Sequence, residues 1–191
     1  MLYGSVLKVC IVTCLVFFCT AVVPVHVDAP IGPAAEQVFI AELNRARDVI
    51  DEVKQMPAVS ELIKRLRDPN EEVKADVEDQ LITKFKDVLY QHGFQQSFRS
   101  SVAPFLAHIT VSYISVLTAK QGDSIIVYFL CESLQSLDHL RQMIASHYIH
   151  EVFVAIIEAV PHTDVGVYVR VKDEDLNVAL QCLAGLQDTG L

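Results

Sequence analysis

The sequence predicts an α+β protein in which an antiparallel sheet of three or four strands packs with helices as an α/β sandwich, preceded by two to three amphipathic helices. Three observations predict this class. Residues 125–131 form a continuous apolar run rich in β-branched and aromatic side chains, which is typical of a central strand. Residues 165–171 alternate valine with other residues at the period of a strand. In residues 34–93, apolar side chains instead recur at helical spacings of three and four.

Composition favours a folded domain and excludes a nucleic-acid-binding role. The chain has 191 residues, enough for one domain with additional segments or for two small domains. Apolar residues make up 52% of it, which is sufficient to fill a core. The net charge is −9, and no basic patch is interleaved with aromatic residues. Because nothing here would neutralise a phosphate backbone, we expect no nucleic-acid partner.

The N-terminal segment, residues 1–29, predicts a signal peptide or an N-terminal membrane anchor. Residues 9–25 carry no charge, Lys8 precedes them, and Val27 and Ala29 are small side chains at the positions that a signal peptidase needs. Cleavage would make the protein secreted. Without cleavage, residues 9–25 would hold it at a membrane with its body outside the cytosol. A cytoplasmic location is the alternative if the leader is an artefact of the gene model.

Residues 34–93 are expected to be a helical region. The apolar side of the first helix, residues 34–56, contains Phe39, Leu43, Ala46, Ile50 and Val53. Ser60 is expected to cap a short second helix, and a third begins at Glu71 and ends at His92–Gly93. Two arrangements remain open: the helices pack as a hairpin of their own, or they cover one face of the sheet.

The next segment is expected to change from an irregular connection to a β-hairpin. Several serines and Pro104 indicate an irregular path over residues 94–106, with phenylalanines as its anchors. Residues 109–113 alternate as a first strand, with a bulge at Ile114–Ser115. Gly122–Ser124 supplies the turn into the second strand, residues 125–131.

Two helices, a third strand and a last helix are expected to complete the module, residues 107–186. Ser133 is placed to cap a helix that runs to about Ile144, and residues 147–160 form the next helix. The third strand, residues 165–171, turns its valines toward the core. The final helix follows from Asp173, with acidic residues in its first turn.

Cysteines and histidines supply the candidates for chemistry, and none of them predicts a reaction. Cys131 and Cys182 are interpreted either as a disulfide, in an oxidising compartment, or as buried apolar side chains. His147 and His150 lie one helical turn apart, as a weak candidate metal site requires, with His139 on the preceding helix as a further member that folding could add. No third ligand completes the set in the sequence. We therefore expect a non-enzymatic protein without a cofactor.

A partner surface is the remaining candidate for a functional site. Tyr168, Arg170 and Lys172 share the face of the third strand that lies opposite the valines. If this strand lies at an edge of the sheet, it offers unpaired backbone groups to an added strand. The alternative is that these side chains only face solvent.

Residues 107–186 resemble the TRADD-like N-terminal domain. The matching segments are 121–127, 131–134, 137–144, the valine-rich strand and 173–176. The resemblance implies an α/β sandwich with an antiparallel sheet. It also implies an adaptor in innate immune or apoptotic signalling, with a protein partner that is TRAF-type or belongs to the death-domain, CARD or NLR signalling proteins. The alternative function is that of a small secreted or luminal α/β protein with an unknown ligand.

Overall fold

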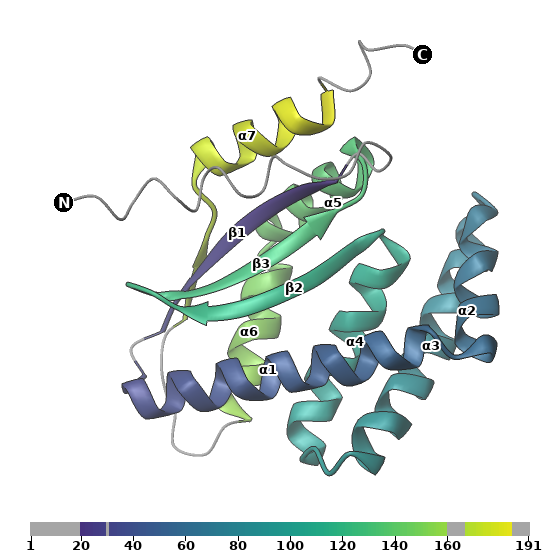
Figure 1. Ribbon diagram of the computed structural model, residues 1–191, viewed down its shortest axis with the longest axis horizontal. Coiled ribbons are helices and arrows are strands. Elements are labelled where there is room, and N and C mark those ends of the chain that lie inside the picture. The colour runs from purple at the N-terminus through teal and green to yellow at the C-terminus, as the bar shows by residue number, and fades with distance from the viewer. Residues whose placement is uncertain (1–19, 30, 160–166, 185–191) are drawn as a thin grey trace.

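A computed structural model describes residues 20–29, 31–159 and 167–184. Its elements follow one another as a strand, a group of helices, a hairpin, two helices, a short strand and a last helix. In order these are β1 Ala21–Asp28, α1 Pro33–Lys54, α2 Pro57–Lys64, the 3-10 turn Arg65–Arg67, α3 Glu71–Gln91, α4 Gln96–Val111, β2 Ile114–Gln121, β3 Ile125–Cys131, α5 Leu134–Ala145, α6 Tyr148–Glu158, β4 Tyr168–Arg170 and α7 Asp173–Ala184 (Figure 1).

The four strands form one antiparallel sheet in the order β2-β3-β1-β4. β1 pairs with β3 from Ala21 opposite Cys131 to Val27 opposite Ile125, and with β4 through three residues. The chain therefore makes two β-α-β units whose strands interleave, which is the split arrangement of a β-α-β-β-α-β sandwich. The predicted fold class is confirmed, with β3 in a central position as the apolar run indicated.

The core lies between the sheet and the helices of the two crossovers. Val23, Val25 and Val27 of β1 are completely buried, as are alternate residues of β3. Against this face Phe129 makes an edge contact with Phe105 of α4, which in turn contacts Phe153 of α6. Of the helices of residues 34–93, α1 packs on the sheet at β2, whereas α3 packs on α1 and α4. α7 packs along β1 and against α5, and lies above β1 in Figure 1.

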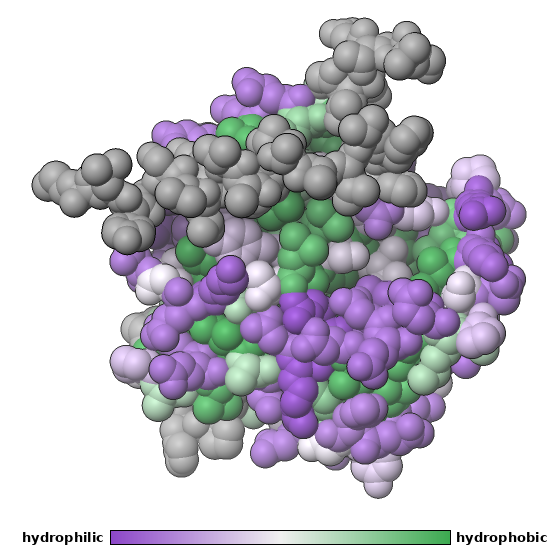
Figure 2. Space-filling view, viewed as in Figure 1, coloured by the Kyte–Doolittle hydropathy of each residue, from purple (hydrophilic) through white to green (hydrophobic). Residues whose placement is uncertain are grey.

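The surface follows the amphipathic pattern of the helices. Figure 2 shows hydrophilic side chains over the outward side of α1 and hydrophobic ones over the sheet above it. The buried side of α1 is Phe39, Leu43, Ala46, Val49, Ile50 and Val53, which includes every residue predicted for it.

Residues 94–113 differ most from the expectation. The predicted irregular connection and the start of the first strand are one helix, α4, which contains Pro104. The strand β2 begins only at Ile114, and its bulge lies between Val116 and Thr118. Nine residues of α4 are buried, so tertiary packing outweighs the unfavourable proline and serines. Phe94, Phe98 and Phe105 are buried anchors, as predicted.

Two other boundaries need correction. The second helix begins at Pro57 rather than after Ser60, because proline suits the first position of a helix. Residues 21–28, predicted to be part of the leader, form β1 in the interior of the sheet. Cleavage after Ala29 would therefore separate a strand from the sheet. The rest of the predicted leader, residues 1–19, lies outside the described residues, as does the first part of the predicted third strand, residues 165 and 166.

Candidate functional site

The predicted partner surface lies on β4, at one edge of the sheet. The Tyr168 side chain is 75% exposed. Arg170 and Lys172 are also exposed, whereas Val167, on the other face, is buried. The predicted alternation of valines toward the core with exposed side chains is therefore correct here. The Arg170 Nε donates to Asp28 Oδ2 of β1 over 2.9 Å. This ion pair ties the edge strand to its neighbour. Lys172, two residues after β4 ends, is in no ion pair within the described part of the chain.

The opposite edge of the sheet is blocked by a side chain at one residue, Ala119. The Asn44 Nδ2 of α1 donates to the Ala119 carbonyl over 2.9 Å, and the Ala119 N–H donates to Asn44 Oδ1 over 2.8 Å. Because β3 lies on the inner side of β2, the amide occupies the outer side as a neighbouring strand would. Both backbone groups of Ala119 are satisfied in this way, which blunts the edge.

A buried histidine lies on β1, the strand that pairs with β4. His26 of β1 lies opposite Arg170 in the register and is only 9% exposed. Its Nδ1 lies 3.2 Å from the hydroxyl oxygen of Ser124, which is itself buried. Burial, followed by the positive charges of Lys172 and Arg170, lowers the pKa of His26 below its ordinary value. The polar pair thus connects the hairpin turn before β3 with β1, the strand beside β4.

The two cysteines of the body are not brought together. Both are free thiols, with Cys131 buried at the end of β3 and Cys182 exposed on α7. The predicted disulfide is therefore not formed, because one thiol faces the core and the other faces solvent. Burial raises the pKa of the Cys131 thiol to about 12, so it is a protonated apolar side chain rather than a nucleophile at neutral pH.

His147 and His150 lie at the start of α6, with ring centroids 6.1 Å apart. His147 is in the left-handed region, with φ of 62°, just before the helix begins. His139 does not join them. Throughout the described residues no three or more His, Cys, Asp or Glu side chains converge on a point where they could hold a metal ion.

His139 instead contacts His108 of α4, a residue that the sequence did not single out. The two Nε2 atoms lie 3.3 Å apart, and the other ring nitrogen of His108 lies 2.9 Å from Glu78 Oε1 of α3. Tyr148 of α6 packs against His108, with ring centroids 5.0 Å apart. Sequence reasoning missed His108 because it placed the residue in a connection between a loop and a strand, where helical neighbours could not be inferred.

Burial is the main influence on the ionisation of this cluster. It lowers the pKa of His139, and the positive charges of His108 and Lys74 act in the same direction. Burial also raises the pKa of Tyr148, with a smaller contribution from Glu78. His139 lines a cleft of about 330 Å³ that also includes Lys74, Ser112 and Ser136. The cluster is therefore partly buried but reaches solvent on the His139 side.

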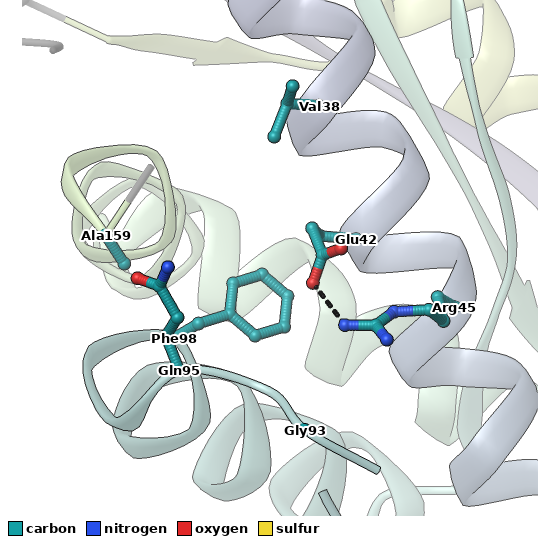
Figure 3. Close-up of a pocket in the computed structure, with 7 residues that line it drawn as sticks. All are labelled: Val38, Glu42, Arg45, Gly93, Gln95, Phe98 and Ala159. Carbon is teal, nitrogen blue, oxygen red and sulfur yellow. Dashed lines mark hydrogen bonds and ion pairs between the residues drawn. The ribbon is translucent and has the colours of Figure 1, made fainter. Parts of the chain in front are cut away.

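A second hollow of about 250 Å³ lies between α1, the start of α4 and the end of α6 (Figure 3). Arg45 and Glu42 pair across 2.8 Å at its rim, and the Arg45 guanidinium stacks 3.8 Å from the centroid of the Phe94 ring. Phe98 lies at the side of the hollow in Figure 3 and is almost completely buried. Because its charged groups satisfy each other, this hollow offers a substrate no free ionic group.

Comparisons with known proteins give no match from which a function could be assigned. No protein-family model, curated protein or solved structure matches the chain. Among the helices of the described residues, none has the length and apolar character that a membrane span requires.

Proposed function

We propose that the protein is a non-enzymatic interaction module that binds an extended segment of a protein partner along β4. The observation that carries this proposal is the difference between the two edges of the sheet. Asn44 occupies the β2 edge at Ala119, whereas among the described residues β4 pairs with β1 alone and presents an exposed tyrosine. A strand added to such an edge gains backbone hydrogen bonds from it and specificity from the neighbouring side chains.

Tyr168 is the side chain best placed to anchor a partner. Tyrosine combines a large apolar ring with a hydroxyl, and such residues dominate binding energy at interfaces. Lys172 adds a positive charge just after the end of the strand, while Asp28 offsets that of Arg170. This arrangement favours a partner strand with an acidic residue near an apolar one.

The partner class comes from the resemblance to the TRADD-like N-terminal domain. On that basis we propose an adaptor role in innate immune or apoptotic signalling, with TRAF-type proteins or death-domain, CARD or NLR proteins as partners. The β-α-β-β-α-β sandwich with an open edge supports this proposal, since an adaptor needs a stable scaffold and a surface but no reacting group.

The proposal is tested by measuring the affinity of purified TRAF domains, death domains and CARDs for the full chain by calorimetry. For a domain that binds, Tyr168→Ala should weaken the affinity about tenfold or more, as loss of an anchoring aromatic residue does. Tyr90→Ala is the matched control, because Tyr90 is 68% exposed on α3, away from the sheet edge.

Two results would contradict the proposal. If Tyr168→Ala and Tyr90→Ala changed the affinity equally, β4 would not be the binding surface. If none of the purified domains bound, the adaptor role would fail.

A further inference from the structure

The Glu78–His108–His139 cluster has the geometry of two metal ligands with a supporting carboxylate. Two imidazole nitrogens bound to one tetrahedral metal ion at about 2.0–2.1 Å lie about 3.3–3.4 Å apart. The Nε2 atoms of His108 and His139 are separated by 3.3 Å. Both rings therefore already stand at the spacing that a shared ion requires.

The second ring nitrogen of His108 is engaged as it is in metal centres. Histidine ligands commonly donate their other N–H to a carboxylate, which fixes the tautomer and makes the free nitrogen a better ligand. Here the His108 Nδ1 lies 2.9 Å from Glu78 Oε1, and the tautomer that donates from Nδ1 to this carboxylate places the Nε2 lone pair on the side of His139. The carboxylate thus prepares His108 for coordination.

The charged side chains around the two histidines influence whether a cation binds there. Glu78 and Asp138 act on His139 with negative charge, and Lys74 opposes them with positive charge. The cleft lined by His139 gives solvent and small ligands access to the remaining coordination positions.

We propose that His108 and His139 bind one Zn²⁺ ion, with Glu78 as the carboxylate that orients His108. Imidazole suits Zn²⁺ among the common divalent ions, and two protein ligands leave the other positions to water or to a group of an incoming molecule. The ion would join α4 of the first β-α-β unit to α5 of the second. This site is independent of the β4 edge and differs from the His147–His150 pair that the sequence pointed to.

The test is a calorimetric titration of the metal-free full chain with ZnCl₂ at neutral pH. We expect one equivalent to bind and to raise the melting temperature. His139→Gln should abolish this binding, and Glu78→Gln should weaken it about 10- to 100-fold, as loss of a supporting carboxylate does. Titration with Co²⁺ should produce visible absorption bands in the original chain that disappear in His139→Gln.

The control is the double variant His147→Gln/His150→Gln, which removes the other histidine pair and should leave the titration unchanged. Circular dichroism of each variant shows whether it has folded, so that loss of binding is not confused with loss of structure. The proposal is overturned if Zn²⁺ does not bind, if binding survives His139→Gln, or if it is lost only in the double variant.

Discussion

At the scale of single residues, buried polar groups show where the molecule is sensitive to its surroundings. His26 is placed in the sheet by the alternation of β1, and Ser124 is the hydrogen-bonding partner on the neighbouring hairpin. A buried histidine that is hydrogen-bonded as a neutral ring resists protonation, because burial penalises the charged form. The free energy needed to protonate the buried ring makes the stability of the fold depend on pH.

We predict that the free energy of unfolding decreases as the pH falls below about 6.5, the ordinary histidine pKa. His26 has a lowered pKa in the folded state, so the unfolded chain binds the proton first and gains stability from it. The loss begins at the unfolded pKa and ends once the pH passes the folded pKa. Urea unfolding of His26→Asn at pH 7 and pH 5 should show a smaller difference between the two values than the original chain shows.

His92→Asn serves as the comparison, because His92 is exposed at the end of α3. An unchanged pH dependence in His26→Asn, or an equal reduction in both variants, would show that His26 does not carry the effect.

At the scale of elements, β1 shows why part of the fold was hidden in the sequence. Its alternating valines lie inside a longer apolar run, so the strand period was masked and the segment was predicted to be a leader. Pro24 also argues against an interior strand. The structure accommodates it because β4 pairs with residues 26–28, so within the described part of the chain Pro24 has a partner strand on one side alone.

We predict that Val25→Asp lowers the free energy of unfolding by roughly 3–5 kcal/mol, because it leaves an uncompensated charge in the core. Val25 is completely buried in β1 and lies opposite Val127. Val178→Asp is the matched control, because Val178 is 58% exposed on α7 and should tolerate the charge. Chemical denaturation followed by circular dichroism measures both. Equal effects of the two substitutions would contradict the placement of β1 inside the sheet.

The other elements were predicted where neighbouring residues in the sequence determine the structure, and missed where contacts between distant residues determine it. α1, α3 and α5 were predicted because helical periodicity, caps and stop signals coincide, as with Ser133 and its capping box. α4 was missed because its local residues favour a loop while its apolar side favours a helix. Only the packing of that side on the sheet decides between them. The alternation around Tyr168 was predicted, but the Asn44 contact joins residues 75 positions apart and has no local signal.

At the scale of the whole molecule, one cluster of aromatic rings joins the two β-α-β units. Phe153 of α6 makes edge contacts with Phe39 of α1, at 6.0 Å between centroids, and with Phe105 of α4, at 5.8 Å. Helices from both crossovers thus meet under the sheet at one side chain. The helical region and the later module share this core, which includes buried residues from Ala21 to Leu183.

We predict that Phe153→Ala lowers the free energy of unfolding by about 3–5 kcal/mol, the usual cost of emptying a buried phenylalanine site. Because the ring contacts both units, unfolding should remain a single transition at a lower denaturant concentration, observed equally by circular dichroism and by tyrosine fluorescence. Tyr90→Ala provides the exposed reference. Two separate transitions in the original chain would show that the units unfold independently.

The unequal edges of the sheet also limit how copies of the chain can assemble. A sheet with two open edges can add molecules without end, and such growth leads to fibres. Here the Asn44 amide fills the outer side of β2 at Ala119, so a copy that joined through β4 would present to the next one an edge with no free backbone group at Ala119. Asn44 on α1 therefore works against growth of the sheet through β2, while β4 can still engage a single added strand.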